Sequence, residues 1–595
     1  MIALNSVLIR RASLQMPFAT HASATNNWAL FTDANDILVA RAVEEVLAVV
    51  HAAQAHADRG GYAAGFLAYE SAPAFDPAFR VHPSVEGLPL AWFGLFEEPR
   101  LHPGPQPPRS DSAAAAGIPW TLHISPAAYH VQTSVIRSLI EAGDTYQVNY
   151  TMPADGTGRV DPWELFEQLC WPSPEPEAAL LRTRHFAVVS ASPELLFCQQ
   201  GNRVTTRPMK GTAPRGRWPA EDADAAERLA RSEKDRAENV MIVDLLRNDL
   251  GRIARPGSVC ASPLFEVTPH RGVWQMTSTV AAETDASPAD VLGALFPCGS
   301  VTGAPKVRTM SIIQRLEGSP RGVYCGALGW FGPGCTARFA VPIRTALVET
   351  TTGRATYNVG SGITWDSNPR AEYEECRAKL VPVERRFPRF ELLETMSWHS
   401  GRGFDAMQAH LQRLAVSAET FGWRVDLKAL EAALLAAAGE WPADGPAQRV
   451  RLTVDHRGCA SVSAAPLEAW RAPRRLGLAA SPVDATSPLL YHKTTYRAVY
   501  ERALQGLPPG VDDVILWNRD GHVTETSICN LAVEDGDGNW WTPPVACGLL
   551  PGTLRAELIR SGSMKERIIP VEELGSFRNV RVFNSVRGVL DAVIV

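Results

Sequence analysis

The sequence lacks long apolar runs and paired cysteines. No stretch of its 595 residues approaches the ~18 uninterrupted apolar residues that a membrane-spanning helix needs. The ten cysteines are scattered and none lies in a C-x-x-C pair, so neither a zinc site nor a disulfide framework is indicated. Arg10 and Arg11 follow a short apolar run, whereas a signal peptide has the opposite order. These absences predict a cytoplasmic protein with no membrane segment.

Strong charge of one sign is also missing. The net charge of −6 gives no sign of a polyanion-binding surface, so nucleic acid is not an expected partner. Hydrophobic residues make up 45% and charged residues 21%, as in an ordinary soluble globular protein. The length exceeds what a single core supports, and two to four domains are expected.

Two proline-rich segments divide the chain. Pro103–Ser112, followed by four alanines, predicts a loop or linker, and Val381–Arg389 predicts a second boundary. The expected domains are residues 1–385, made of an N-terminal part (1–112) and a catalytic core (120–385), and residues 390–595. The apolar patterns predict strands over 186–198, 323–350 and 390–395, and helices over 129–142, 219–251, 303–317 and 410–421. The fold class is therefore α+β.

Lys210 is the residue of greatest chemical interest in the first domain. It lies in Arg207–Gly216, where Pro208 and Gly211 favour a tight turn. A lysine can be a nucleophile when burial or a cationic neighbour lowers its pKa. A lone turn lysine is more often solvated, so the neighbouring motifs decide between these interpretations.

Two predicted helical segments each carry carboxylates three positions apart. One pair is Asp235 and Glu238, and the other is Glu372 and Glu375. Residues at i and i+3 share a helix face, so each helix can present two oxygens to one point, as Mg²⁺ requires. The alternatives are a solvated acidic face and, for Glu375, a salt bridge to Lys379.

The segment Phe296–Lys306 supplies the hydroxyls of Ser300 and Thr302 and backbone N–H groups ahead of a predicted helix. Such a segment can hold a carboxylate. It lacks the G-x-x-x-x-G-K-[ST] spacing of a phosphate-binding Walker loop. An ordinary turn before a helix is the alternative.

Six motifs carry a resemblance to a known family. They are GDTYQVNYT (143–151), SASPELLF (190–197), RPMKGTAPRG (207–216), AENVMIVDLLRNDLGRI (237–253), GSVTGAPKVRTM (299–310) and GSGITWDSNPRAEYEECRAK (360–379). In this order they resemble the chorismate-binding enzymes, which include anthranilate, isochorismate, salicylate and aminodeoxychorismate synthases. The resemblance is dense over residues 130–385, and it implies the α/β sandwich of that family.

The family resemblance implies a role for Lys210. Anthranilate and isochorismate synthases usually have Ala at this position, whereas component I of aminodeoxychorismate synthase has Lys. By resemblance, Lys210 attacks C2 of chorismate and expels the C4 hydroxyl. Ammonia then adds at C4 and displaces the lysine, giving 4-amino-4-deoxychorismate. Covalent catalysis of this kind replaces one hard displacement by two easier ones.

The resemblance assigns the other residues as well. Glu194 matches the general acid, and Glu238 and Glu375 match Mg²⁺ ligands, supported by Asp235 and Glu372 through water. Residues that match carboxylate-binding positions of the substrate site are Tyr324, Arg344, Gly360, Gly362 and Lys379, with Ser300 and Thr302 in the cradle. Gln275 departs from the usual His, which puts proton transfer at that position in doubt.

No cysteine lies in the G-x-C-x-G context of a glutamine amidotransferase nucleophile. We therefore expect a separate glutamine amidotransferase subunit to supply ammonia, or free ammonia to replace it.

The second domain carries another lysine of interest. Lys493 is followed by Glu525 and then by a glycine-containing turn, Cys547–Arg555. A lysine, an acid and a helix N-terminus fit a pyridoxal phosphate site, although lysine and acid alone are common. The motifs FELLETM (390–396), AHLQRLAVSAETFGW (409–423), DGHVTETSICNL (520–531) and GLLPGTLR (548–555) resemble fold-type IV pyridoxal-phosphate enzymes. These include branched-chain and D-amino-acid aminotransferases and 4-amino-4-deoxychorismate lyases.

By this resemblance Lys493 forms the Schiff base and Glu525 pairs with the pyridinium nitrogen. Arg413 and the backbone around Thr553 and Leu554 hold the phosphate, and the family implies a homodimer through this domain. Lyase is favoured over aminotransferase because the first domain would make the lyase substrate.

The sequence thus predicts a bifunctional enzyme that makes 4-aminobenzoate, a folate precursor, from chorismate and ammonia. Lys493 would remove the C4 proton before pyruvate leaves. An anthranilate synthase fused to an amino-acid aminotransferase is the alternative enzyme, against which Lys210 argues. A catalytically inactive scaffold would have lost the reactive residues, which are all present.

Overall fold

The computed structural model describes residues 2–10, 28–107, 117–442 and 445–595. Arg11 and residues 108–116, which include half of the predicted linker and the four alanines, lie outside these ranges. The chain forms two compact units. The first unit comprises Met1–Arg215 and Ala225–Pro388, and the second comprises Gly216–Asp224 and Arg389–Val595. Among the described residues, none of the helices combines the length and apolar character needed to cross a membrane.

Two antiparallel sheets form the framework of the first unit. The ten-stranded sheet has the order β18 (Gly303–Ala304), β8 (Gln147–Gly156), β22 (Ala355–Ile363), β21 (Thr345–Glu349), β10 (Phe186–Ser192), β9 (Glu177–Arg182), β1 (Ser6–Arg10), β2 (Trp28–Phe31) and β6 (Arg100–His102), with β7 (Trp120–Leu122) paired to β8. The nine-stranded sheet has the order β14 (Cys260–Ala261), β17 (Val280–Glu283), β12 (Arg203–Arg207), β11 (Leu195–Gln200), β20 (Thr336–Ala340), β19 (Ala327–Gly332), β4 (Tyr62–Leu67), β5 (Ala91–Phe96) and β3 (Asp36–Ala40).

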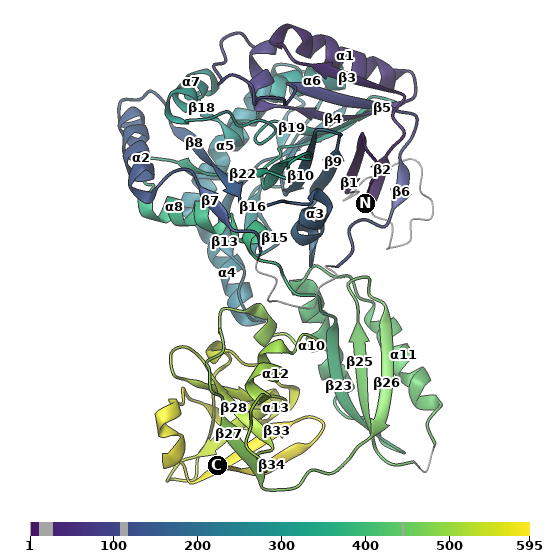
Figure 1. Ribbon diagram of the computed structural model, residues 1–595, viewed down its shortest axis with the longest axis vertical. Helices are drawn as coiled ribbons and strands as arrows, with labels where there is room; N and C mark the ends of the chain where they lie inside the picture. The colour runs from purple at the N-terminus through teal and green to yellow at the C-terminus, as the bar shows by residue number, and fades with distance from the viewer. Residues whose placement is uncertain (1, 11–27, 108–116, 443–444) are drawn as a thin grey trace. The chain divides into compact units, whose positions relative to one another are not determined.

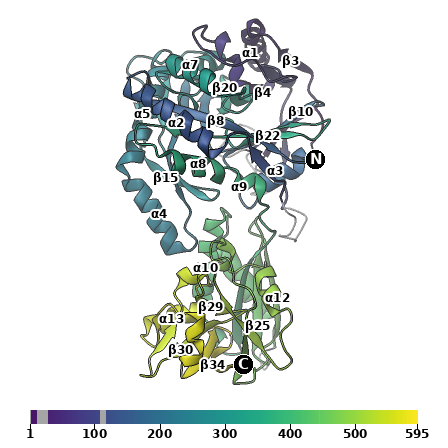
Figure 2. The same cartoon turned by 60° about the vertical axis from the view of Figure 1, so that its left-hand side comes forward.

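The two sheets pack against each other as a sandwich. One apolar cluster takes Val7 and Leu181 from the ten-stranded sheet and Phe66 and Trp330 from the nine-stranded sheet. Burying these faces together supplies much of the driving force for the unit. Helices α2 (Pro126–Glu141), α3 (Pro162–Cys170), α7 (Lys306–Leu316) and α8 (Pro369–Ala378) pack on the ten-stranded sheet, and α1 (Val43–Asp58), α5 (Glu233–Gly251) and α6 (Pro288–Leu295) pack on the other (Figures 1 and 2).

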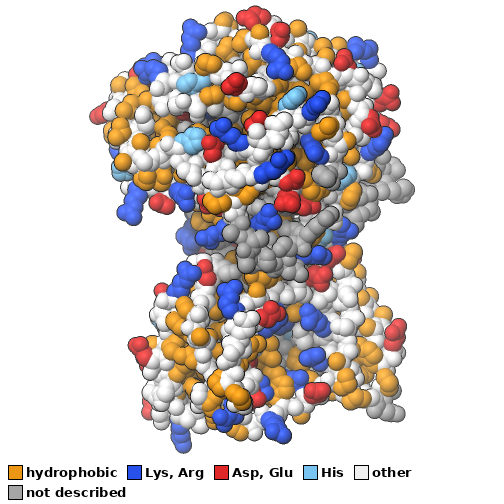
Figure 3. All heavy atoms as spheres, viewed as in Figure 1, with side chains coloured by type: hydrophobic (Ala, Val, Ile, Leu, Met, Phe, Trp, Pro, Cys, Tyr) orange, Lys and Arg blue, Asp and Glu red, His pale blue; other side chains and the backbone are white. Residues whose placement is uncertain are grey.

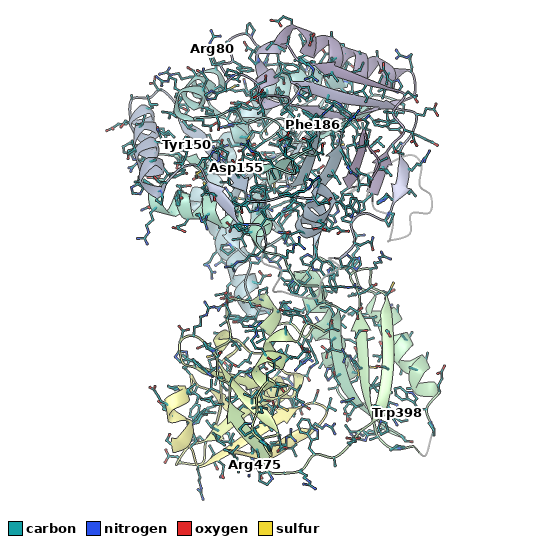
Figure 4. All side chains as sticks on the ribbon, viewed as in Figure 1. Arg80, Tyr150, Asp155, Phe186, Trp398 and Arg475 are labelled. Atoms are coloured by element: carbon teal, nitrogen blue, oxygen red, sulfur yellow. The ribbon has the colours of Figure 1, made fainter. Side chains whose placement is uncertain are left out.

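A third, three-stranded sheet and strand β8 position the chemistry of this unit. The small sheet has the order β13 (Met209–Pro214), β16 (Val273–Thr277) and β15 (Glu266–His270). On β8, Tyr150 belongs to the cluster under the helices, whereas Asp155 lies on the opposite face; both are labelled in Figure 4. This alternation follows from the two-residue period of a strand. It leaves the odd-numbered positions of β8 free to line a site.

The second unit contains two further sheets. A four-stranded antiparallel sheet has the order β24 (Gly403–Phe404), β23 (Leu392–His399), β25 (Gln448–Val454) and β26 (Ala460–Pro466), with α10 (Met407–Thr420) and α11 (Leu427–Gly439) beside it. A mixed eight-stranded sheet has the order β29 (Val523–Thr526), β28 (Asp513–Trp517), β27 (Arg474–Leu478), β34 (Gly588–Ile594), β33 (Asn579–Asn584), β30 (Asn530–Glu534), β31 (Trp540–Thr542) and β32 (Lys565–Glu566). Helices α12 (Ala498–Leu504) and α13 (Thr553–Arg560) pack on it.

The predicted elements are confirmed in kind, with two corrections in detail. The helix expected over 219–251 is two helices, α4 (Pro219–Arg231) and α5, because Ser232 caps the second one by accepting a hydrogen bond from the Asp235 amide at 3.3 Å. The strand expected over 186–198 is β10 and β11, interrupted at residues 193 and 194. That interruption releases Glu194 from the sheet ladder. A short helix, α9 (Val381–Glu384), ends the first unit near the expected boundary.

Charged side chains of both signs are mixed over the visible faces of the units (Figure 3). Mixed surface charge agrees with the small net charge of the sequence. Neither unit presents a large basic field on the side shown.

Candidate active sites

Lys210 lies on β13 with its amine against β22. A Cβ atom at Gly362 would lie 2.7 Å from the Lys210 Nζ atom, so only glycine leaves room for the amine. Burial lowers the pKa of Lys210, and the charge of Lys379 adds to this, while Glu238 and Glu194 act in the opposite direction. A lowered pKa increases the neutral, nucleophilic fraction of the amine.

Glu194 is a buried acid close to that amine. Its side chain is 3% exposed, and Ser300 Oγ donates a hydrogen bond of 2.6 Å to its Oε1 atom. Burial raises the pKa of Glu194 to about 7, although the Ser300 hydrogen bond and the charge of Lys210 oppose the rise. A carboxyl group with this pKa is protonated in a large fraction of molecules near neutrality, which suits a general acid.

Carboxylates from two helices also surround Lys210. Both Glu238 on α5 and Glu375 on α8 act on the pKa of Lys210, so the two helices face one point. Burial raises the pKa of Glu238, and the like charges of Asp235 and Glu372 raise it further. Burial also works to raise the pKa of Glu375, but the charge of Lys379 and its 2.6 Å hydrogen bond bring it below the ordinary value.

These carboxylates have a donor set that suits Mg²⁺. The repulsion among Glu238, Asp235 and Glu372 is what a divalent cation would relieve, and carboxylate oxygens are the ligands that Mg²⁺ prefers. Ser367 Oγ holds Glu372 by a 2.8 Å hydrogen bond. Across the described ranges, no three His, Cys, Asp or Glu side chains are gathered closely enough to hold a metal ion on their own. Substrate oxygens and water would have to complete the coordination.

The residues predicted to bind the substrate's carboxylates differ in their hydrogen-bond partners. Arg344 Nη1 donates to Glu175 Oε1 at 2.6 Å, and Lys379 Nζ donates to the Gly360 carbonyl at 2.7 Å. The charge of Arg344 acts on the pKa of Lys379, which Glu375 raises against the effect of burial. Thr302 Oγ1 donates to the Cys298 carbonyl at 3.0 Å within its own turn, whereas Ser300 is turned toward Glu194.

Tyr324 lines a cavity of about 200 Å³. The cavity extends over the inner face of β8 and β22, where Asp155, Thr356 and Asn358 line it. Lys210 and Glu194 do not line this cavity.

Gln147 is a site residue that the sequence interpretation did not single out. Both of its side-chain amide atoms are buried without a hydrogen-bond partner among the described residues. A Cβ atom at Gly362 would lie 3.1 Å from its Nε2 atom, so Gln147 shares the space beside Lys210. Its position in the motif GDTYQVNYT and the alternation of β8 were the available signals.

Gln275 has a structural role that follows from its amide. Its Nε2 atom donates to the Gly211 carbonyl at 2.9 Å, and its Oε1 atom accepts from Thr212 at 3.1 Å. Asn239 Nδ2 donates to the Lys210 carbonyl at 3.4 Å. The backbone that carries Lys210 is thus held on both sides.

In the second unit, Lys493 and Glu525 form a separate buried cluster. Burial lowers the pKa of Lys493 to about 8, and the charge of Arg413 lowers it further, against Glu394. Burial raises the pKa of Glu525 to about 8, despite hydrogen bonds from Tyr500 at 3.0 Å and the Leu550 amide at 3.2 Å. A buried carboxylate of this kind gains from a cationic partner.

The residues near α13 fit a phosphate group. Thr553 begins the helix, and its hydroxyl is buried with no hydrogen-bond partner among the described residues. Arg413 Nη1 donates to the Pro551 carbonyl at 3.3 Å, and its other nitrogens donate to Glu394 at 2.9 and 2.6 Å. Leu554 packs against an apolar cluster that contains Phe583. An orphaned hydroxyl at a helix N-terminus suits an anion.

Residues 13–385 match the family of chorismate binding enzymes, which is more than half of the chain. The protein belongs to that family. Residues 391–594 match the amino-transferase class IV family, which implies pyridoxal phosphate as the cofactor of the second segment. These matches confirm the predicted fold class and the resemblance seen in the motifs.

Curated relatives and a solved structure support the same grouping. The chain is 46% identical over 254 residues to an aminodeoxychorismate synthase of Streptomyces griseus, covering 42% of this chain and 35% of that protein. It is 40% identical over 252 residues to aminodeoxychorismate synthase component 1 of Bacillus subtilis, covering 42% of this chain and 53% of that protein. The chain therefore spans about a third to a half of these relatives. Anthranilate synthase component I from Streptococcus pneumoniae has the same fold, with a TM-score of 0.53 and 24% identity over 63% of this chain and 96% of that one.

Proposed function

We propose that this protein makes 4-aminobenzoate in two steps, from chorismate and ammonia through 4-amino-4-deoxychorismate. The observation that carries the proposal is the half-buried Lys210, whose amine lies against Gly362, together with the buried acid Glu194, whose charge acts on the pKa of that amine. The class IV segment then supplies a second buried lysine, Lys493, for the consuming reaction. The domain bounds 1–385 and 390–595 and a cytoplasmic location belong to the same proposal.

The first step uses the opposite protonation preferences of the two groups. The neutral amine of Lys210 attacks C2 of chorismate, the ring double bond shifts, and the C4 hydroxyl leaves as water with the proton of Glu194. Ammonia then attacks C4, the double bond shifts back, and the Lys210 amine leaves C2. Glu194 receives a proton from the added ammonia, which restores the acid.

Several side chains would position the substrate for this step. Arg344 and Lys379 are charged donors for its two carboxylates. Mg²⁺ would be held by Glu238 and Glu375, with Asp235 and Glu372 in support, and would supply Lewis-acid binding of the ring carboxylate. Gln147, beside Lys210, would offer its unpaired amide to the ring substituents or to ammonia.

The second step would take place at Lys493. Pyridoxal phosphate, when bound, supplies an electron sink for the carbon that bears the amine. Lys493 removes the proton from C4 of the substrate, and pyruvate is eliminated as the ring becomes aromatic. Glu525 would pair with the ring nitrogen of the cofactor, and Thr553 and Arg413 would hold its phosphate.

Two partners are part of the proposal. A separate glutamine amidotransferase would deliver ammonia to the first unit, since the chain shows no G-x-C-x-G nucleophile motif. A second copy of the chain would pair through the class IV segment.

The test is a product analysis of the purified protein with chorismate, ammonium, Mg²⁺ and pyridoxal phosphate. We expect 4-aminobenzoate and an equal amount of pyruvate. Formation of anthranilate, the product of the alternative synthase, would overturn the assignment of the first unit.

An amino-acid aminotransferase is the second candidate for the class IV segment. The Lys493→Ala variant separates the two assignments. If the segment is the lyase, the variant accumulates 4-amino-4-deoxychorismate and makes no 4-aminobenzoate. Full 4-aminobenzoate formation by the variant, with no other lyase present, would favour the aminotransferase.

A further inference from the structure

Glu175 is a buried carboxylate that no step above uses. Its side chain is 3% exposed and accepts hydrogen bonds of 2.6 Å from Arg344 Nη1 and 2.6 Å from His270 Nδ1. The amide of Arg271 donates to it at 3.2 Å. Burial alone would raise the pKa of Glu175, but the charge of Arg344 and the hydrogen bond from His270 hold it at about 2. Glu175 is therefore a fixed negative charge.

The same contacts connect Arg344 to β15, which pairs with β16, the strand beside the one that carries Lys210. His270 ends β15, and its Nε2 atom lies 3.2 Å from Thr268 Oγ1. Thr268 Oγ1 donates to the Gln275 carbonyl at 3.4 Å, and the Gln275 amide donates to the Gly211 carbonyl at 2.9 Å. A continuous set of hydrogen bonds thus runs from the residue after Lys210 to the guanidinium of Arg344.

Arg344 itself needs such support. Its backbone φ is 51°, in the left-handed region that costs free energy for any residue other than glycine. Strain of this kind persists only where the surroundings enforce it, and it concentrates at functional sites. The Arg344 carbonyl accepts from the Ala191 amide at 3.1 Å, which fixes the backbone, while Glu175 fixes the side chain.

We propose that Glu175 is a positioning residue, which orients the guanidinium of Arg344 so that its remaining N–H groups bind a carboxylate of chorismate. His270 fixes the other carboxylate oxygen of Glu175 and ties the pair to the β15–β16 hairpin. This inference rests on the proposed function, because it assigns the substrate carboxylate to Arg344. Pre-orienting the arginine removes an ordering cost from substrate binding.

The chain offers a matched control two residues away. Glu177 is equally buried and forms an ion pair with Arg338, with one hydrogen bond of 2.9 Å and a second, shorter one. Replacing either glutamate by glutamine breaks a buried ion pair of the same kind. Only the change at Glu175 releases Arg344.

The experiment measures steady-state chorismate kinetics and direct chorismate binding for the Glu175→Gln and Glu177→Gln proteins. We expect Glu175→Gln to raise KM and Kd for chorismate about tenfold, with kcat lowered by less than about threefold. Both changes should lower the midpoint of thermal unfolding by similar amounts, because each breaks a buried ion pair. Glu177→Gln should nevertheless leave KM for chorismate unchanged. Equal KM values for the two variants would overturn the inference, since both glutamates would then be merely structural.

A double variant tests whether Glu175 acts through Arg344. In the Arg344→Lys background the guanidinium is gone, so adding Glu175→Gln should change KM by less than about twofold. Independent, multiplying effects of the two changes would contradict the inference. If Glu175→Gln does not fold, Glu175→Asp, which keeps the charge but shortens the reach, should raise KM by an intermediate factor. Wild-type protein that makes no aminated product would instead overturn the proposed function, and chorismate binding would still report on Glu175.

Discussion

At the scale of single residues, burial acts on Lys210 and Glu194 in the same direction, toward the neutral form. It lowers the pKa of the amine and raises the pKa of the acid to about 7. A neutral amine and a protonated carboxyl group are what nucleophilic attack with acid-assisted departure requires. Burial therefore favours the reactive, neutral form of both side chains.

This pair predicts a pH dependence for the first step. Glu194 must be protonated, so kcat/KM for chorismate should fall as the pH rises through about 7. Lys210 must be neutral to attack, and burial favours this by lowering its pKa. The measurement is made at a fixed concentration of un-ionised ammonia, because ammonia itself titrates. Glu194→Gln should lose about 10²- to 10⁴-fold in rate and lose the fall above pH 7; an unchanged alkaline limb would exclude Glu194 as the acid.

Substitution of Lys210 tests the nucleophile directly. Lys210→Ala should abolish formation of 4-amino-4-deoxychorismate, because no amine remains to attack C2. Lys210→Arg keeps a positive charge without a usable nucleophile, and we expect it to be equally inactive. Chorismate consumption followed by liquid chromatography measures both. Substantial activity of the arginine variant would mean that charge, and not attack, is what Lys210 provides.

At the scale of elements, the close pairing of β8 with β22 shapes the first site. Gly362 pairs with Asn149 across this ladder, and its missing side chain makes room for the Lys210 amine. These two strands lie about 200 residues apart in the sequence. The sheet register therefore determines which residues can meet.

Gly362→Ala is expected to damage catalysis more than folding. The new methyl group would lie 2.7 Å from the Lys210 amine, the end of a flexible side chain that can move away. We expect a loss of at least about tenfold in kcat/KM, since displacement by even 1 Å costs much catalytic geometry. Gly251→Ala, where a Cβ meets nothing within 4 Å, is the control. Thermal unfolding of both variants should stay close to that of wild type, and full activity of Gly362→Ala would refute the packing argument.

The first turn of α13 gives a second prediction at this scale. Thr553→Val removes a buried hydroxyl that has no partner among the described residues, so the protein without cofactor should lose no stability. Its affinity for pyridoxal phosphate should fall about tenfold, as titration by absorbance would show. Ser561→Ala, just beyond the other end of the helix, should change neither quantity. Unchanged cofactor affinity of Thr553→Val would remove Thr553 from the phosphate site.

The sequence predicted the type of most elements, and it singled out Lys210, Glu194 and Lys493 because these residues lie in long contiguous motifs. It missed Gln147 and Glu175 for a physical reason. Gln147 is recognisable only once β8 is placed beside β22, and Glu175 only once Arg344 and His270 reach it from distant segments. The break between α4 and α5 was missed for a different reason. Ser232 is a residue type that commonly caps a helix, but it lies within a continuous helical pattern.

At the scale of the whole molecule, the two catalytic clusters share no residue. The charged groups with the largest effects on the pKa of Lys210 belong to the first unit, and those with the largest effects on the pKa of Lys493 belong to the second. Each unit thus contains the charged groups that act most strongly on the pKa of its own lysine.

This separation predicts complementation between inactive variants. A mixture of Lys210→Ala and Lys493→Ala proteins should restore 4-aminobenzoate formation, because one protein makes the intermediate and the other consumes it. Following the product with time would show a lag while the intermediate accumulates. If each variant keeps its own half-reaction but the mixture makes no 4-aminobenzoate, the intermediate is not released, and the sites depend on each other.

The residues around Lys210 are far apart in the sequence, and this affects when the first site can form during translation. This cluster draws on positions from Gln147 to Lys379, so it forms only after that whole length has left the ribosome. The roughly 200 residues of the second unit that follow Pro388 are still to be translated at that point, which takes about 10–40 s at about 5–20 residues per second. During that interval a nascent chain can hold a finished first site and no second one.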